Sequence, residues 1–377
     1  MKYKHFKISF CIVCMNRLHQ LSQTLLQNIR DNEDYSELEF IVLDYNSNDG
    51  MAEWMKENVN EFITNGRLQY YRTNEPLSFS HSHSKNLAFN LADGEIVCNI
   101  NADHYTGKGF AQYVNEMFNE NGNCVLTTID SHKTKKGYHP PKDVLGKVCV
   151  KKDDFLKLKG FDERMNRYGF EDWDFINRLE LIGLKRVLID DFKYLEFISH
   201  NDEERFSLNA DQLESFYVNY ITPSVSEVLF FYKDRSYESG VLIDNSTINS
   251  ENSNYSFQKR HYHFEYAVQQ PGWETGHWDL DPNNATLTLS ADKGLEMKTG
   301  KLKNDLNNNN TCLDIKDRRY FRLTDTLIIE NILEFNYFSY NRSLLEENLE
   351  TNTAVVNKTF GEAVVFKNFQ SSQPIHI

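Results

Sequence analysis

The sequence predicts two domains: a mostly parallel α/β domain over residues 1–222 and a β-rich domain over residues 223–377. Three observations favour this division. At 377 residues, the chain is longer than one average hydrophobic core requires. Its first half alternates short apolar runs with amphipathic helical periodicity. From Pro223 onward, Tyr-, Phe- and Thr-rich alternating runs with Asn, Gly and Asp turns are typical of strands.

In the first domain, strands are predicted at residues 7–15, 39–44, 68–73, 95–101 and 124–128. Helices are predicted at residues 18–28, 50–58, 82–91 and 109–119. Short apolar strands separated by helices indicate a mostly parallel sheet that is covered on both faces. Ligands of such sheets bind beyond the carboxyl ends of the strands, so the residues at these ends are the candidates for chemistry.

In the second domain, strands are expected at residues 259–268 and 285–290, and a helix at residues 325–349. Trp273 and Trp278 have two readings, because exposed aromatic rings stack on sugars whereas buried rings form a core. His261, His263 and His277 lack the Cys or carboxylate partners that would complete a metal-ligand spacing. The role of this domain is therefore left open.

The charge balance disfavours nucleic acid as a partner. With 41 basic and 55 acidic residues, the formal net charge is −14, so an anionic substrate needs a local cation. The sequence has no signal peptide and no apolar run of about 20 residues, which predicts a soluble, cytoplasmic protein. Cys11, Cys14, Cys98 and Cys149 lie in apolar runs and are expected to be buried and reduced.

Polar residues follow the first two predicted strands. Asn16 and Arg17 come after the first strand, and Asp44 leads into the turn Tyr45-Asn46-Ser47-Asn48-Asp49-Gly50. A carboxylate that leaves a strand into such a turn can accept hydrogen bonds from a base or a ribose. Turn formation alone is the competing explanation.

A later apolar strand ends in Asn101-Ala102-Asp103-His104, and Lys85 lies on the helix that precedes this strand. Carboxylate and imidazole groups at a strand end are suitable ligands for a divalent cation, which can hold a diphosphate as it leaves. Asp and Asn after a strand are also common turn residues, so this segment alone does not establish a metal site.

Acidic and aromatic residues gather between residues 160 and 175. Glu171 and Asp172 open a predicted helix whose apolar face is Phe175, Ile176, Leu179 and Ile182. The helix dipole favours acids in the first turn and is the simplest explanation for them. It does not explain Tyr168 and Trp173, which flank the acids as aromatic side chains do where a sugar ring stacks beside a general base.

In order along the chain, the segments CMNR, LDYNSND, SKNLAFNLADGE, NADH, GFDE, GFEDWDF and ISH resemble family-2 glycosyltransferases of the GT-A fold. The resemblance covers about residues 7–219. The segment GFEDWDFINRL is similar to the galactosyltransferase and N-acetylgalactosaminyltransferase branch, which includes β-1,4-galactosyltransferases and bacterial chondroitin polymerase domains. The resemblance implies a GT-A domain that binds a nucleotide sugar.

The resemblance also implies roles for residues near the nucleotide. Asp44 would contact uracil or ribose, with Asn16 and Arg17 beside the nucleotide. Lys85 stands where the family often has Arg near the diphosphate, and both side chains are cations. Tyr45 replaces a frequent second acid of the family.

For the reacting centre, the resemblance makes Asp172 the catalytic base and Glu171 a contact for the acceptor hydroxyl. Tyr168 would line the sugar site, and Trp173 is counted with it as substrate-binding. Two further residues, Asp103 and His200, match the metal ligands of the branch, whereas Asn101 stands in place of the first acid of its D-x-D motif.

These inferences predict an inverting transfer of Gal or GalNAc from a UDP-sugar, with Mn²⁺ or Mg²⁺ as cofactor. The expected partners are the UDP-sugar and a glycan or glycolipid acceptor of polysaccharide biosynthesis; peripheral membrane association and oligomer formation stay open. The alternative is a non-catalytic nucleotide-sugar or glycan-binding protein that retains the fold. A glycosidase would need two carboxylates flanking the bond, and a sugar nucleotidyltransferase would need a Gly-rich phosphate loop near the N-terminus.

Overall fold

The computed structural model describes residues 3–130, 135–199, 213–222, 225–233, 236–243, 273–274, 295–301, 312–315, 318–323 and 326–377. The chain forms two compact units, one of Met1–His200 with Leu344–Ile377 and the other of Asn201–Ser343. The predicted boundaries, residues 1–222 and 223–377, differ from these units at both ends of the second domain. The last part of the chain returns to the first unit.

The first unit is built on a nine-stranded sheet with the order β16-β15-β3-β2-β1-β4-β6-β5-β7. Its strands are β1 (Ile8–Cys14), β2 (Leu38–Tyr45), β3 (Leu68–Thr73), β4 (Ile96–Asn99), β5 (Cys124–Thr127), β6 (Val148–Lys151), β7 (Lys185–Leu188), β15 (Val364–Lys367) and β16 (Pro374–His376). Strands β3, β2, β1 and β4 are parallel and form the centre. Each predicted strand of the first domain is confirmed, and the bounds of β3 agree at both ends.

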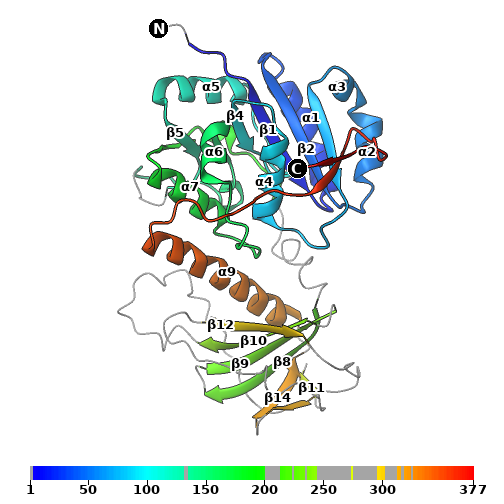
Figure 1. Ribbon diagram of the computed structural model, residues 1–377, viewed down its shortest axis with the longest axis vertical. Helices are drawn as coiled ribbons and strands as arrows, with labels where there is room; N and C mark the ends of the chain where they lie inside the picture. Colours follow the sequence, from blue (N-terminus) through cyan, green and yellow to red (C-terminus); the bar gives the residue numbers. More distant parts are fainter. Residues whose placement is uncertain are drawn as a thin grey trace. The chain divides into compact units, whose positions relative to one another are not determined.

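Helices cover both faces of this sheet (Figure 1). They are α1 (Leu18–Asp31), α2 (Met51–Asn58), α3 (Asn60–Thr64), α4 (His81–Leu91), α5 (Phe110–Asn121), α6 (Lys152–Leu158) and α7 (Glu171–Leu181), with 3₁₀ turns η1 (Lys142–Val144) and η2 (Phe192–Tyr194). Apolar residues of α1, α2 and α5 belong to one core, and those of α4, α6 and α7 to the other. The predicted α/β architecture is confirmed.

The C-terminal strands extend the sheet at its β3 edge. β15 pairs antiparallel with β3, Phe366 opposite Arg72 and Lys367 opposite Tyr71, and β16 pairs with β15. In Figure 1 this segment is drawn in red beside β3. The sequence analysis did not predict these strands, because each is at most four residues long and β15 pairs with β3, far away in sequence.

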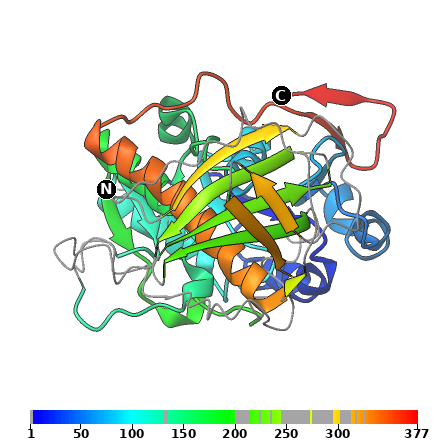
Figure 2. The same cartoon turned by 90° about the horizontal axis from the view of Figure 1, so that it is seen from below.

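The second unit contains a separate antiparallel sheet (Figure 2). Its described strands are β8 (Leu213–Thr222), β9 (Val225–Tyr232), β10 (Ser236–Ile243), β11 (Trp273–Glu274), β12 (Leu295–Lys301), β13 (Cys312–Ile315) and β14 (Arg318–Leu323). The predicted C-terminal helix is confirmed as α9 (Thr326–Glu350), whose residues from Leu344 onward belong to the first unit. The strands predicted at residues 259–268 and 285–290, with His261, His263, His277 and Trp278, lie outside the described residues.

Cys11, Cys14, Cys98, Cys124 and Cys149 are free and buried. Among the helices of the described ranges, none combines the length and the apolar character that crossing a membrane demands.

The loop after α6 depends on a glycine. Gly160 has φ +71°, and a Cβ atom there would overlap Asn86 Oδ1 and lie 2.8 Å from Cδ2 of Phe360 in the C-terminal segment. The Asn86 side chain binds the same loop, because its Oδ1 accepts a hydrogen bond from Phe161 N at 2.7 Å. The close approach of α4, this loop and the C-terminal segment therefore requires glycine at position 160.

We predict that Gly160→Ala destabilises the protein more than Gly109→Ala. Both glycines have positive φ, but a Cβ at Gly109 meets nothing within 4 Å. Gly109→Ala should cost only the backbone strain of about 1 kcal/mol, whereas Gly160→Ala should add about 1–3 kcal/mol of overpacking. Urea denaturation of both variants measures the difference. Equal losses would show that Asn86 and Phe360 move aside freely.

Candidate functional site

The predicted site residues lie at the carboxyl edge of the parallel strands. Asn16 follows β1, Asp44 lies near the end of β2, and Asn101 follows β4. Parallel strands end at one edge of their sheet, so these positions share that edge. Asn16 is hydrogen-bonded to the turn after Asp44. A second group consists of Lys85, the first turn of α7 and Asn101, which lie close together.

The loops after β1 and β2 are bonded to each other. The backbone N–H of Asn16 donates to Ser47 Oγ at 3.1 Å, and Asn16 Oδ1 accepts from Asn48 N at 2.8 Å. Asn16 and Asn46 have φ +55° and +64°, a conformation that Asn tolerates better than most residues. Arg17 is the residue before α1, and its carbonyl accepts hydrogen bonds from the first turn of that helix.

Asp44 is fully buried and holds this turn. Its Oδ1 accepts from Ser47 N at 2.7 Å, and its Oδ2 accepts from the Tyr70 hydroxyl at 2.6 Å. Arg72 Nη1 lies 3.5 Å from Oδ2, because Arg72 is directly opposite Asp44 in the β2–β3 register. Sequence reasoning missed these two β3 residues. A carboxylate oxygen can accept further hydrogen bonds, so contact with uracil or ribose stays a prediction.

The first turn of α7 forms a buried ionic cluster with α4. Lys85 Nζ donates to Glu171 Oε1 at 3.0 Å and to Asp172 Oδ1 at 2.7 Å. Lys85 is 5% exposed, so its charge must be compensated locally, and the two carboxylates do so. Lys85 therefore binds the acids of α7, and its predicted place near the diphosphate stays a prediction.

The two carboxylates have different acidities. Burial raises the pKa of Asp172 to about 6, although Lys85 lowers it, and the charge of Glu171 adds to the rise. Burial also acts to raise the pKa of Glu171, but Lys85 and His81 outweigh it and hold that pKa below its ordinary value. Glu171 therefore stays ionised while Asp172 titrates near neutrality, as a general base requires.

His81 and Tyr168 complete the cluster on the Glu171 side. His81 Nδ1 lies 3.7 Å from Glu171 Oε1, and its ring packs edge-on against Tyr168 at 5.2 Å. Burial lowers the pKa of His81 to about 4, so the imidazole is neutral at pH 7. Glu171 Oε2 is buried, and none of the described residues donates a hydrogen bond to it. Sequence reasoning missed His81, although its spacing of four residues from Lys85 places both on one face of α4.

Asp172 also lies beside the end of β4. A Cβ atom at Gly146 would be 3.2 Å from Asp172 Oδ2 and 3.1 Å from Asn101 Nδ2, so both side chains border this glycine. Asn99 Nδ2 donates to Asn101 Oδ1 at 2.9 Å and to the Gly146 carbonyl at 2.7 Å. The amide that replaces the first acid of the D-x-D motif is therefore held next to the candidate base.

Asp103 suits one ligand of a divalent cation. Its side chain is 14% exposed, and its carbonyl accepts from Ile198 N at 2.8 Å. His104, by contrast, is fully buried with Nε2 2.6 Å from the Asp143 carbonyl, so this ring serves the fold. His200 lies outside the described residues. Within the described ranges, no group of three or more His, Cys, Asp and Glu residues could hold a metal ion.

Lys147 holds the Asp103 loop in place. It is fully buried, and its Nζ donates to the carbonyls of Tyr105, at 3.0 Å, and Tyr194. Burial lowers the pKa of Lys147 to about 8. This lysine joins two segments far apart in sequence, and no local pattern pointed to it.

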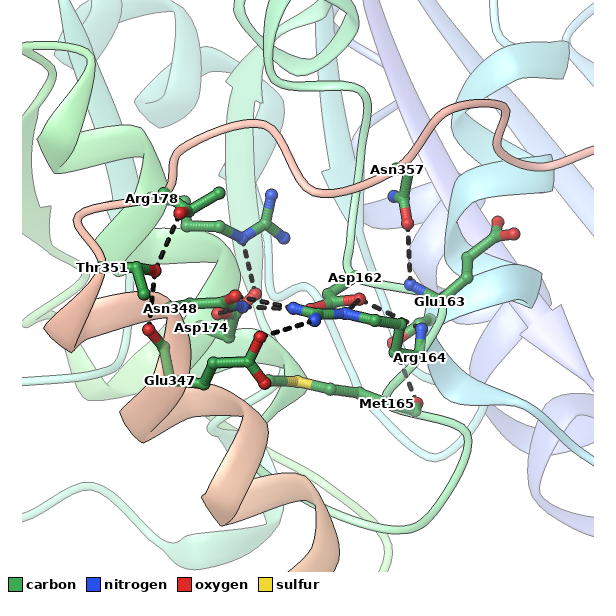
Figure 3. A network of polar contacts seen from close by, with 12 residues as sticks. Asp162, Glu163, Arg164, Met165, Asp174, Arg178, Glu347, Asn348, Thr351 and Asn357 are labelled. Carbon is green, nitrogen blue, oxygen red and sulfur yellow. Dashed lines mark hydrogen bonds and ion pairs between the residues drawn. The ribbon is translucent and has the colours of Figure 1, made fainter.

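The other acids of the region are structural. Asp162 is paired with Arg164 at 2.8 Å and Asp174 with Arg178 at 2.6 Å (Figure 3). Trp173 packs partly buried against the core that contains α4, α6 and α7. Only Glu171 and Asp172 among the acids of residues 162–174 face Lys85.

Residues 9–179 match the sequence model of the family described as Glycosyl transferase family 2, and the first unit has the α/β GT-A fold. The chain is similar to the mannosyltransferase PcManGT from Pyrobaculum calidifontis in complex with GDP-Man and Mn²⁺, at 18% identity and a TM-score of 0.40, over 49% of this chain and 55% of that one. It is also similar to TarS 1-349 from S. aureus in complex with UDP, at 16% identity and a TM-score of 0.41, over 54% of this chain and 63% of that one. No curated protein matches the chain.

We predict that Lys85→Met strongly destabilises the protein at neutral pH and less at pH 5. Removing one partner of a buried ion pair costs about 3 kcal/mol or more. Without Lys85 the pKa values of Glu171 and Asp172 rise in the folded state. A carboxyl group whose pKa is raised in the folded state lowers the free energy of unfolding as the pH rises through its unfolded and folded pKa values. The stability lost by Lys85→Met should therefore grow from pH 5 to pH 7.

Urea denaturation at both pH values tests this prediction, with Lys85→Met/Asp172→Asn as the control. The double variant removes one of the two stranded charges, so it should be more stable at pH 7 than Lys85→Met alone. A deficit that is independent of pH would mean that the lost contacts are not ionic.

Proposed function

We propose that this chain is a metal-dependent, inverting glycosyltransferase that transfers Gal or GalNAc from a UDP-sugar to a glycan acceptor. The observation that carries the proposal is the buried Lys85–Glu171–Asp172 cluster at the carboxyl edge of a glycosyl transferase family 2 domain. It contains one carboxylate that stays ionised and one whose pKa of about 6 suits a base at neutral pH.

In the proposed reaction, Asp172 removes the proton of an acceptor hydroxyl. The acceptor oxygen forms a bond to the anomeric carbon while the bond from that carbon to the diphosphate oxygen breaks, and UDP leaves. A single displacement of this kind needs one carboxylate base and inverts the anomeric centre. No described residue donates to Glu171 Oε2, which supports the role of Glu171 as an acceptor for a sugar hydroxyl, because a buried carboxylate oxygen gains from such a hydrogen bond.

For the donor, we propose that Asn16, Arg17 and Asp44 contact the nucleoside. Tyr168 and Trp173 would line the sugar pocket, since both lie near the cluster and are partly exposed. Lys85 would lie near the diphosphate as a cation, as well as binding the two acids of α7.

Asp103 and His200 would hold Mn²⁺ or Mg²⁺. When bound, the ion neutralises charge on the leaving diphosphate. The family description names no sugar. The proposal of Gal or GalNAc as the transferred sugar is based on the similarity of GFEDWDFINRL to the galactosyltransferase and N-acetylgalactosaminyltransferase branch. For the second unit, we propose acceptor positioning, which its aromatic content supports.

We predict that Asp172→Asn lowers transfer by about 10²–10⁴-fold, because amide nitrogen cannot take the proton. UDP affinity should change little. Wild-type kcat should rise with pH around a midpoint near 6, where Asp172 ionises. UDP release from UDP-Gal and UDP-GalNAc measures transfer, and calorimetry measures UDP binding. The control is Asp153→Asn, an exposed acid on α6. UDP binding without UDP release in the wild type would favour the non-catalytic alternative.

We predict that chelation abolishes activity and that Mn²⁺ restores it. Asp103→Asn and His200→Ala should each weaken metal-dependent UDP binding about 10-fold or more, since each removes one ligand. Asp34→Asn, on an exposed loop, is the matched control. Isothermal titration of UDP with and without Mn²⁺ reports the effect. Full activity in excess chelator would refute both ligand assignments.

A further inference from the structure

Asn348, near the end of α9, is buried and contacts α7, the helix that carries the candidate base Asp172. It is 3% exposed, and its Nδ2 donates to Asp174 Oδ1 at 2.8 Å and to Asp162 Oδ2 at 3.0 Å (Figure 3). Its Oδ1 accepts from Arg164 Nη2 at 2.7 Å. One neutral amide therefore joins two fully buried carboxylates and a guanidinium group.

An amide suits this position for an electrostatic reason. Asp162 and Asp174 would repel each other if they met directly, and the two N–H groups of Asn348 keep both carboxylates satisfied without adding charge. Arg164 and Arg178 supply the compensating cations from either side. No other uncharged side chain of similar size offers two donors and an acceptor, except the longer Gln.

The first connection from Asn348 to the candidate base runs along α7. Asp174 and Asp172 are two residues apart, about 200° around the helix axis, so they face opposite sides. Lys85 holds the first turn of α7 on one side, and Asn348 holds it on the other through Asp174, which also pairs with Arg178 within the helix. A rotation of this turn would move Asp172 relative to Lys85.

The backbone before α7 adds to this requirement. Phe170 has φ +66°, which is unfavourable for a bulky side chain and costs about 1 kcal/mol or more. Such a conformation persists only where its surroundings impose it. The contacts of Asp174 on one side and of Glu171 and Asp172 on the other supply that constraint.

The second connection runs through the loop after α6. Asp162 follows Phe161, whose ring lies 5.3 Å from Lys85 Nζ and stacks on Phe175 of α7 at 4.0 Å. The backbone of Phe161 is bound to Asn86, the residue next to Lys85. Asn348 therefore supports the loop that packs beneath Lys85.

We propose that Asn348 is a positioning residue for the reaction, setting the placement of Asp172 against Lys85 through Asp174 and Asp162. The proposal rests on the proposed function for its kinetic consequence. It assigns a task to the C-terminal segment Leu344–Ile377, which the domain motifs do not include. The hydrogen bonds of the Asn348 side chain are made to Asp162, Asp174 and Arg164, so it acts on Asp172 through other residues.

The test compares Asn348→Ala with Glu347→Gln in the full chain. Glu347 is the adjacent residue and also contacts Arg164, at 3.1 Å, but its side chain is 55% exposed, so its loss should matter little. Asn348→Ser is a milder variant, because one hydroxyl can donate to only one of the two carboxylates. Circular dichroism and a melting curve establish that each variant is folded at the assay temperature.

Three quantities are measured: kcat, the Kd for UDP, and the titration midpoint of Asp172. The midpoint is followed by carboxyl NMR, with the signal assigned by its absence in Asp172→Asn. The groups facing Asp172 are Lys85, Glu171 and, beyond Glu171, His81. A looser Lys85 contact lowers the stabilisation of the Asp172 anion, so the midpoint should move to higher pH.

For Asn348→Ala we expect kcat to fall about 10-fold or more, UDP affinity to stay within about twofold, and the midpoint to rise by about half a pH unit or more. Asn348→Ser should be intermediate and Glu347→Gln should match the wild type. Asn348 variants that melt earlier but keep the wild-type kcat and midpoint would overturn the proposal, because the residue would then serve stability alone. If the wild type released no UDP, the proposed function would fail, whereas the NMR midpoint would still decide whether Asn348 positions Asp172.

Discussion

The burial of one lysine between two carboxylates is the interaction on which the site depends. Lys85, Glu171 and Asp172 are nearly inaccessible to solvent, so none of the three charges is stable without the others. Their pairing joins α4 to the first turn of α7. The two acids also differ in pKa. Lys85 holds the pKa of Glu171 below its ordinary value, whereas burial raises the pKa of Asp172 to about 6.

The surrounding polar groups are organised around this cluster in layers. His81 is kept neutral by burial and leaves the Lys85 charge to the acids. Gly146 allows Asn101 and Asp172 to approach each other at the end of β4. On the side of α7 away from Lys85, Asp162 and Asp174 are paired with Arg164 and Arg178, and both accept hydrogen bonds from Asn348. The helix is therefore held from both sides. The acids of this region thus divide into a pair that binds Lys85, Glu171 and Asp172, and a supporting pair, Asp162 and Asp174.

The C-terminal segment links the parts of the first unit. β15 extends the sheet beside β3, whose Tyr70 and Arg72 contact Asp44. Asn348 supports α7, and the Gly361 backbone donates to Glu163 in the loop after α6. The C-terminal segment therefore contacts β3, next to Asp44, and α7, which carries Glu171 and Asp172. A domain defined by its motifs alone would omit these contacts.

The sequence by itself determined the α/β class and the central strands, and it predicted Glu171 and Asp172 as the candidate reactive acids. These features follow from local periodicity and from residue types at strand ends and at a helix start, which are properties of short segments. The environment of Lys85, the buried setting of Asp44, the supporting role of Asp162 and Asp174, and the return of residues 344–377 were decided only by tertiary structure. Each depends on a partner distant in the chain, such as Asn348 for Asp174 and Tyr70 for Asp44, and burial and charge compensation arise only when those partners meet.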